Sequence, residues 1–444
     1  MSREWRASGS VLALLRYARA MAASAALDRR AVKETYVTQR ARSRAFFDAL
    51  DESVYYTRPI ALRNPFVFYE GHLPAFVVNT LLKRALGRPG IDERLEVLFA
   101  RGIDPEDEAA VPTGTSPWPS RAEVLRYGAE ADAAILDALE NAELVREDEP
   151  CLVNGEAVRA ILEHEVMHQE TLLYMAHRLP YETKRRLPQG LLDTSASPHA
   201  SRTIAIPAGE ARLGVDFGEI PFAWDNEKPS LSVRVPAFSI ESLPVTNGEY
   251  LEFVRATDRP LPSFWERDGE GGFVWRGMKK AIPLPLSWPV WTSGDDAAAF
   301  AAWRGRRLPT EAEWHRAAYG TPEGVDRAQP WGGEPVDASR AHADFAGTEP
   351  VPCGARPCGA SAWGIEDLVG NGWEWTSTPF GGFPGFAPTA SYPNYSADFF
   401  DGKHWVMRGG SPATDASLIR RSFRNWFRSE YPYVYAKFRL AGGR

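Results

Sequence analysis

The 444-residue sequence predicts an α+β protein in which a bundle of helices precedes an irregular domain of short strands, helices and loops. Throughout residues 1–194, apolar residues recur at the 3.6-residue spacing of a helix. Residues 199–444 instead contain short apolar stretches separated by Gly, Pro, Asn and Asp, and they hold thirteen of the fifteen tryptophans. We therefore expect two domains, 1–194 and 199–444, joined by the turn-forming stretch Ser195–Pro198.

The first domain is predicted to be helical in several segments. Helical spacing is found in Val11–Ala18, Val77–Ala85, Leu95–Ala100, Arg121–Leu144 and, most clearly, Gly155–Leu179. Asn64-Pro65 and Ser120 are typical of helix starts. Asn and Ser side chains accept hydrogen bonds from the backbone of the first turn, and Pro lacks an N–H group where the helix offers no acceptor for one. A four-helix bundle is the simplest arrangement that buries these apolar stripes.

The second domain is predicted to mix strands and helices. Apolar stretches of strand length occupy Thr203–Ile206, Ser232–Val235 and Trp405–Arg408. Two helices interrupt them, Thr246–Arg255 and Thr310–Ala318, each opened by a threonine that can cap the first turn. Glu313 follows Thr310 by three residues, which completes a capping box.

Composition excludes several classes of function. The formal net charge is −7 and there is no basic tail, which argues against non-specific nucleic-acid binding. The longest apolar candidate, Val11–Leu27, is interrupted by Arg16 and Arg19, so we expect neither a membrane span nor a signal peptide. Three cysteines cannot form a disulfide framework, and a cytoplasmic location is the natural expectation.

The most informative motif is His164-Glu165-Val166-Met167-His168 in the strongest predicted helix. A separation of four residues places both imidazoles on one helix face, in an apolar stripe that includes Ile161 and Leu172. Each buried ring has two nitrogens that need partners, and a shared metal ion would satisfy both rings. The alternative is a pair of core histidines bound by other polar groups.

Two metal sites fit this motif. H-E-x-x-H is the signature of zinc hydrolases, in which the glutamate is the general base, but the extension with a third histidine is absent after His168. Alternatively, the third ligand comes from elsewhere in the bundle. His72 is the only histidine before residue 164, and Pro74 suggests that it lies near a helix start. Three imidazoles on one side of an ion suit non-heme Fe(II), with Glu165 and Glu170 available to accept the ring N–H bonds.

Four motifs in the second domain carry a family resemblance: Arg307–Trp314, Gly370–Thr376, Arg408–Ser411 and Phe438–Leu440. This part resembles the formylglycine-generating-enzyme fold, which is C-type-lectin-like, and the first part resembles the DinB-like four-helix bundle. With the two histidines upstream, the whole chain is similar to the ergothioneine-type sulfoxide synthases. Those non-heme iron enzymes use dioxygen to join a thiol sulfur to the imidazole of hercynine. Selenoneine synthases are close relatives that take selenium from a selenosugar.

The resemblance implies roles for particular residues. It implies that His72, His164 and His168 bind Fe(II), that Asn425 and Trp426 contact hercynine, and that Tyr392 supplies a proton, with Tyr395 three residues later. Aromatic faces suit the quaternary ammonium of hercynine, which cannot donate hydrogen bonds. The other expected substrate contacts are Met167, Phe383 and Phe427.

Departures from the family pattern bear on the chalcogen donor. Met167 stands where relatives often have Gln, and Phe427 where synthases that use γ-glutamylcysteine commonly have Asp. The loop Gly102–Ser120 lacks Arg and Lys and contains the acids Asp104, Glu106, Asp107 and Glu108. These acids would repel an anionic peptide but not a neutral selenosugar. We therefore favour C–Se bond formation with a selenosugar, with cysteine or γ-glutamylcysteine as the alternative donor.

Other activities remain as alternatives. Formylglycine generation is excluded, because it requires a cysteine pair in the C-terminal segment and Arg408–Leu440 contains none. Asp367, Asn371 and Glu374 could hold a structural calcium ion, as in some relatives. A zinc hydrolase and a non-catalytic, lectin-like binding module are the competing classes of function.

Overall fold

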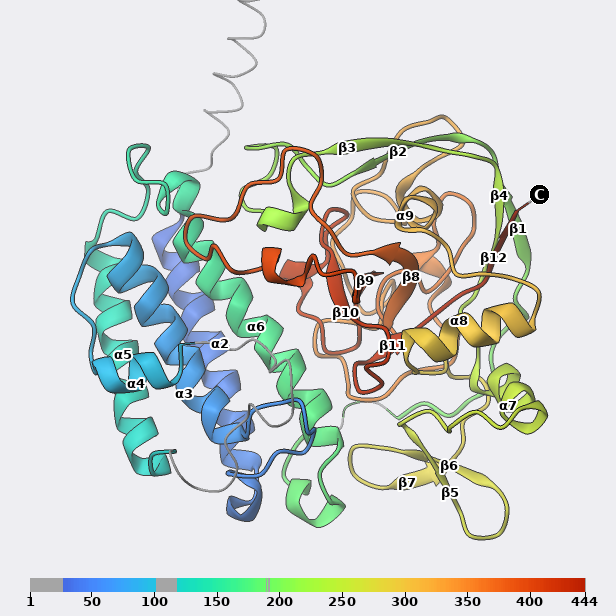
Figure 1. Ribbon diagram of the computed structural model, residues 1–444, viewed down its shortest axis with the longest axis horizontal. Coiled ribbons are helices and arrows are strands. Elements are labelled where there is room, and N and C mark those ends of the chain that lie inside the picture. The colour runs from blue at the N-terminus through green and yellow to red at the C-terminus, as the bar shows by residue number, and fades with distance from the viewer. Residues whose placement is uncertain (1–26, 101–117, 189, 191, 444) are drawn as a thin grey trace, which may run out of the picture.

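The computed structural model describes residues 27–100, 118–188, 190 and 192–443. In Figure 1 a group of long helices lies beside a second domain of short strands, helices and loops. This arrangement confirms the predicted α+β class, a bundle followed by an irregular mixed domain. The predicted helix Val11–Ala18 and most of the acidic loop 102–120 lie outside the described residues.

Among the described residues, four long helical segments form the bundle. They are α2 (Arg29–Ala49), α3 (Phe66–Val77) continued by the π-helical η2 (Val78–Ala85), α5 (Arg121–Asn141) and α6 (Glu156–His177), with the short α4 (Glu93–Leu98) between them. Ser120 caps α5 as expected, since its side chain accepts a hydrogen bond from the backbone of Glu123. Pro65 is the N-cap of α3 rather than its first helical residue.

His72 lies in the middle of α3 and not near a helix start, so the expectation drawn from Pro74 was wrong. Pro74 is inside the helix, where a proline costs about 3 kcal/mol because it removes a backbone donor. All twelve residues of α3 are buried, and burial of this almost wholly apolar helix outweighs that cost.

The second domain contains four small sheets. One sheet has the order β1 (Thr203–Ile206), β4 (Phe238–Glu241), β12 (Ala441–Gly443), and a second has the order β10 (Asn425–Arg428), β9 (His404–Arg408), β8 (Trp373–Pro379), β11 (Ala436–Lys437). A third sheet pairs β2 (Gly209–Leu213) with β3 (Leu231–Val235). The fourth has the order β5 (Trp265–Arg267), β6 (Phe273–Arg276), β7 (Ala281–Pro283). The three predicted strand segments fall in β1, β3 and β9. All pairings are antiparallel except that of β11 with β8.

Three helices accompany these sheets: α7 (Asn247–Ala256), α8 (Gly294–Trp303) and α9 (Glu311–Tyr319). Thr246 and Thr310 cap α7 and α9, and both helices have complete capping boxes, with Glu249 and Glu313 as the reciprocal partners. Short 3₁₀ turns occupy Glu52–Val54, Val153–Gly155, Tyr181–Lys184, Asp225–Glu227, Pro357–Gly359, Ala397–Phe399 and Ala416–Leu418.

Helix α6 joins the two domains and lies between them in Figure 1. One face of α6 carries Glu163, Glu170 and His177, each about two turns from the next. These side chains form hydrogen bonds with the second-domain residues Arg420, Ser411 and Tyr435, respectively. One cluster of buried hydrophobic residues runs through both domains, from Phe46 in the bundle to Phe438 near the C-terminus. Within the described part of the chain, no helix combines the length and apolar character that crossing a membrane requires.

The segment predicted to link the domains is packed on the second domain. Ser287 Oγ donates to the carbonyl of Ser195 (2.6 Å), and Trp288 Nε1 donates to that of Asp193 (2.5 Å). These bonds hold the chain close to the domain surface where it leaves the bundle. The boundary at residues 195–198 itself stays a prediction.

Candidate metal centre

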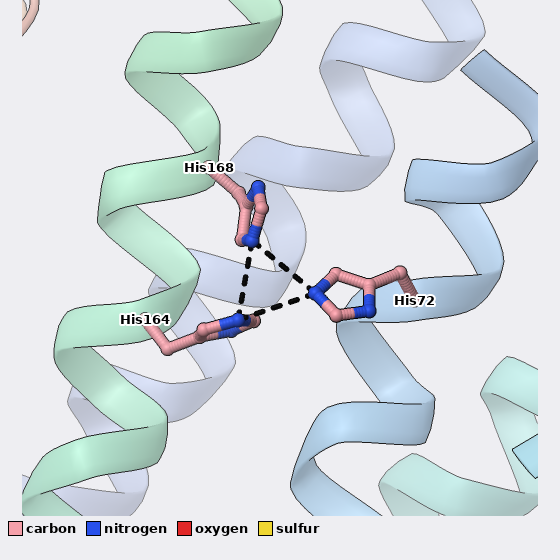
Figure 2. Close-up of side chains that lie close together, drawn as sticks. All are labelled: His72, His164 and His168. Carbon is pink, nitrogen blue, oxygen red and sulfur yellow. Dashed lines mark hydrogen bonds between the residues drawn. The ribbon is translucent and has the colours of Figure 1, made fainter. Parts of the chain in front are cut away.

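Three histidine side chains from two helices meet inside the bundle. His72 comes from α3, and His164 and His168 come from successive turns of α6, with their Nε2 atoms turned toward one another (Figure 2). The Nε2 atoms are 3.2 Å apart between His72 and His164, 3.2 Å between His72 and His168, and 3.1 Å between His164 and His168. In the described part of the chain, this is the group of side chains whose arrangement could hold a metal ion.

The triangle has the dimensions of a metal site. Two nitrogen ligands about 2.1 Å from one ion and at roughly right angles to each other lie about 3.0 Å apart. Three neutral rings at this separation can share at most two N–H···N hydrogen bonds, whereas one cation would satisfy all three Nε2 atoms together. The donor set is three imidazoles, which suit iron, zinc, copper and nickel. The side chains present therefore fit a metal ion.

The tautomer of His72 is determined by its surroundings. Its Nδ1 lies 2.7 Å from the carbonyl oxygen of Phe99, which can only accept, so Nδ1 carries the proton and Nε2 keeps its lone pair. The ring also stacks on Phe68, with 5.2 Å between the ring centroids. His164 is held in a similar way, because its ring lies flat on Phe76.

Burial keeps all three rings neutral at physiological pH. It lowers the pKa of His72 to about 4, against a partial opposing effect of the hydrogen bond to Phe99. Burial likewise lowers the pKa values of His164 and His168 well below the ordinary value, and the neighbouring histidines lower them further. Metal binding requires neutral imidazoles, so the site does not have to release protons at neutral pH.

Glu165 and Glu170 of α6 do not accept hydrogen bonds from the three histidines, and that expectation was wrong. Glu165 accepts hydrogen bonds from Arg40 Nη1 (3.1 Å) and from Ser43 Oγ on α2. A residue adjacent to a ligand points about 100° away around a helix, which turns this carboxylate away from the metal side. Because Glu165 is bound in a buried ion pair with Arg40, it is unsuited to be the general base of a zinc hydrolase.

Glu170 points toward the second domain. Its carboxylate accepts hydrogen bonds from Trp373 Nε1 (2.8 Å), Ser411 Oγ (2.6 Å) and Thr414 Oγ1 (2.8 Å). Trp373 and Ser411 belong to two of the motifs that carry the family resemblance, Gly370–Thr376 and Arg408–Ser411. Their role at the interface is to bind the helix that bears two metal ligands.

Aromatic side chains from the second domain approach the histidines. The ring of Tyr392 lies 6.2 Å from that of His164 and 5.0 Å from that of Phe76. Tyr395 stacks on Trp224 at 4.0 Å and meets Trp426 edge-on at 5.2 Å, while its hydroxyl donates to Met167 Sδ (3.4 Å). Burial raises the pKa of Tyr395 well above its ordinary value, so this phenol is protonated at neutral pH. We call Tyr392, Tyr395, Trp224 and Trp426 the aromatic wall.

The other expected substrate residues lie apart from this wall. Asn425 and Phe427 directly flank Trp426 on β10, so their side chains point to the opposite face of the strand. Phe427 stacks on Tyr431, with 5.3 Å between centroids, and faces Tyr174 of α6. Phe383 lies under the guanidinium of Arg424, 4.3 Å from the ring centroid.

Sequence reasoning missed Arg63, which lies beside Phe427. The buried guanidinium donates to Tyr431 Oη (3.1 Å) and to the hydroxyl of Tyr174, and it lies 5.9 Å from the centroid of the Phe427 ring. Its positive charge contributes to the low pKa of His168, so it acts on the metal side of the interface. Arg63 is in a loop between two helices and carries no local motif that could have identified it.

The residues proposed for calcium already have protein partners. Asp367 accepts from the backbone of Gly354 (2.8 Å), and the Asn371 amide is paired with the backbone of Val351. Glu374 is bound by Arg439, and the buried ammonium of Lys437 donates to the carbonyls of Gly370 and Gly372 nearby. A lysine therefore supplies the positive charge beside these groups.

Two family models match the chain. The sulfatase-modifying factor enzyme 1-like domain matches residues 188–443, and the DinB superfamily matches residues 35–172.

Similar proteins match most of the chain. The hercynine oxygenase of Mycobacterium tuberculosis is 33% identical over 405 residues, which cover 79% of this chain and 88% of that protein. The hercynine oxygenase of Mycolicibacterium smegmatis is 36% identical over 344 residues, 71% of this chain and 76% of that protein. The ergothioneine biosynthesis protein 1 of Schizosaccharomyces pombe is 32% identical over 437 residues, 88% of this chain and 53% of that protein.

Proposed function

The chain belongs to the hercynine oxygenase family, and from this premise we propose that it is a non-heme Fe(II) enzyme that uses dioxygen to join a chalcogen to the imidazole of hercynine. The observation that carries the proposal is the triangle of three neutral histidine nitrogens, each within 3.2 Å of the next. When bound, Fe(II) supplies a centre at which dioxygen and the donor are held together.

The chain's own residues would prepare this reaction. The Phe99 carbonyl orients His72, and Phe76 and Phe68 fix the planes of His164 and His72. The faces of Trp426 and Tyr395 attract the trimethylammonium of hercynine through cation–π interactions and exclude water around it. Tyr392, beside His164, holds a proton on its phenol that can be given to a reduced oxygen species.

For the donor, we propose a selenosugar, so that the enzyme forms a C–Se bond. Phe427, Tyr431 and Tyr174 offer an aromatic surface where related enzymes that use a peptide thiol commonly have a carboxylate. The apolar face of a sugar packs well on such rings. The acidic composition of the loop 102–120 supports a donor without carboxylates.

A thiol such as cysteine or γ-glutamylcysteine is the second candidate donor. The buried guanidinium of Arg63, near His168 and Phe427, favours this alternative, because a guanidinium binds carboxylates strongly. The names of the Mycobacterium and Schizosaccharomyces relatives also support it.

The reaction balances without an external reductant if the product is a chalcogen oxide. One C–H bond of hercynine and one Se–H or S–H bond of the donor are replaced by a C–Se or C–S bond. One atom of dioxygen is added to the chalcogen, and the other leaves as water with the two hydrogens.

The test is a reaction assembled without oxygen. The purified protein is mixed with Fe(II), hercynine and one donor, which is a selenosugar, cysteine or γ-glutamylcysteine. Oxygen is then admitted, and the masses of the products are measured by mass spectrometry. We expect a hercynine–selenosugar adduct. Formation of a sulfoxide from a thiol, with no selenosugar turnover, would overturn the choice of donor, and the absence of any hercynine adduct would overturn the proposed function.

A further inference from the structure

Glu156, the first residue of α6, binds a loop of the second domain that is 235 residues away in the sequence. Its Oε1 accepts two hydrogen bonds from Ser391, one from the backbone N–H and one from the hydroxyl, both 2.9 Å long. Ser391 is only 1% exposed, whereas Glu156 is half-buried. In Figure 1 the loop after β8 extends across to the bundle.

The loop that Glu156 binds carries Tyr392 and Tyr395, two residues of the aromatic wall. Tyr392 directly follows Ser391, and its ring packs against Phe76 and lies 6.2 Å from the ring of His164. Tyr395 follows one turn later and bonds Met167, the residue before the second ligand on α6. Both ends of this short segment are thus attached to the same helix.

Helix α6 sets the distance between these attachments and the metal ligands. Glu156 precedes His164 by eight residues, just over two turns of α6, so the two side chains are about 80° apart around the helix. Eight residues correspond to about 12 Å along the axis, a length that a hydrogen-bonded helix keeps almost unchanged. The Glu156 carboxylate accepts both hydrogen bonds of Ser391, and it therefore fixes the position of the Tyr392 backbone relative to His164.

We propose that Glu156 is a positioning residue, which holds the phenol of Tyr392 at its working distance from the histidine triangle through Ser391. This inference rests on the proposed function. Misplacement of a catalytic group by about 1 Å can cost about a hundredfold in rate. A mobile Tyr392 would lower the amount of product formed for each dioxygen consumed, because oxygen would be reduced without its proton arriving in time.

The test compares substitutions that differ in what they offer Ser391. Glu156→Ala removes the acceptor, whereas Glu156→Gln keeps an oxygen that can accept both bonds. We expect Glu156→Ala to lower product per dioxygen and kcat by about tenfold, Glu156→Gln to stay within about twofold of the unchanged protein, and Ser391→Ala to be intermediate. Glu93→Ala, at the first position of α4, is the matched control and should have no effect.

A double substitution separates positioning of Tyr392 from a general structural role. If Glu156 acts through Tyr392, Glu156→Ala should add nothing to the loss caused by Tyr392→Phe. An equal further loss in the Tyr392→Phe background, or a loss of Co(II) binding by Glu156→Ala, would overturn the proposal.

Hydrogen exchange gives a readout that does not depend on turnover. Glu156→Ala should speed amide exchange at residues 389–396 at least about tenfold, and unchanged exchange there would contradict the inference. If the unchanged protein makes no hercynine adduct, the proposed function fails, but the exchange measurement still decides whether Glu156 holds this loop.

Discussion

A backbone carbonyl, and not a carboxylate, orients the ligand His72. The Phe99 carbonyl is available because it belongs to the end of α4, where backbone oxygens have no partner within the helix. The spacing of His164 and His168 predicted that they share a helix face, and the need for a third ligand pointed to His72. The partner of His72 could not be predicted, because a carbonyl has no sequence signature and its position depends on how α4 packs on α3.

Removal of a single ligand should disrupt the metal site. We expect His164→Ala to lower the affinity for Co(II) or Fe(II) at least about a hundredfold, because two imidazoles remain. An absorption titration with Co(II) measures this loss. His199→Ala is the control, since that histidine is about one-third exposed and pairs with Glu366 on the second domain. A His164→Ala protein that binds iron tightly and turns over hercynine would contradict the assignment.

The glutamate of the H-E-x-x-H motif should matter for stability rather than for turnover. In Glu165→Gln, the ion pair with buried Arg40 becomes a weaker bond, and we expect a loss of about 2 kcal/mol in the free energy of unfolding. Denaturant unfolding measures it, with Glu34→Gln as the control because Glu34 pairs with Arg30 in water. A Glu165→Gln protein that is fully stable but has lost all turnover would contradict this structural role.

At the scale of the element, α6 has two functional faces. The face at Ile161, His164, His168 and Leu172 was predicted from apolar spacing and turns into the bundle. The face at Glu163, Glu170 and His177 was not predicted, because its partners lie 241 residues from Glu170 and 257 from Glu163. Local spacing identifies an apolar stripe, but polar residues that bind a distant domain look like ordinary solvent-exposed ones.

Arg420 is the central polar contact between this helix and the second domain. It forms ion pairs with Glu163 of α6 (2.8 Å) and with the buried Glu227 (2.5 Å). Arg420→Met should leave two carboxylates without a cation and cost about 3 kcal/mol, measured by denaturant unfolding. The neighbouring Arg421→Met, whose pair with Glu219 is more exposed, should cost far less. Equal losses in the two variants would contradict a special role for Arg420.

At the scale of the molecule, the sequence predicted the order of a helical part and a mixed part but not the strand pairings. The last strand, β12, pairs with β4 about two hundred residues earlier, and β11 lies parallel to β8. Individual strands such as Thr203–Ile206 could be recognised by their composition. Their partners could not, because pairing depends on which distant segments the loops bring together.

The shared core predicts that both domains unfold together. Tryptophan fluorescence reports almost only on the second domain, which holds thirteen of the fifteen tryptophans, and helical circular dichroism reports mainly on the bundle. Because one hydrophobic cluster and the α6 contacts join the domains, we expect the two signals to change at the same denaturant concentration. Two separate transitions would show that the domains are independent.

The stability of the metal-free protein should depend on pH through its buried histidines. The pKa of His72 is about 4 in the fold, and those of His164 and His168 are also lowered, whereas in the unfolded chain they have ordinary values near 6.5. The unfolded chain therefore binds more protons between these values, and the free energy of unfolding falls as the pH is lowered below about 6.5. Thermal unfolding between pH 7.5 and pH 5 measures this fall. In His72→Phe the stability should fall less steeply with pH than in the unchanged protein. An equal dependence on pH in the two proteins would contradict the prediction.

The metal ligands lie on two helices of the bundle, whereas the aromatic wall comes from the second domain. The gene therefore encodes the three histidines in its first half and the aromatic wall in its second half. Recombination or mutagenesis confined to residues 380–431 alters three of the four wall residues while the three histidines stay unchanged. This division allows the wall to vary in evolution while the histidine triangle is kept, and it gives a protein engineer a region to diversify that leaves the triangle untouched.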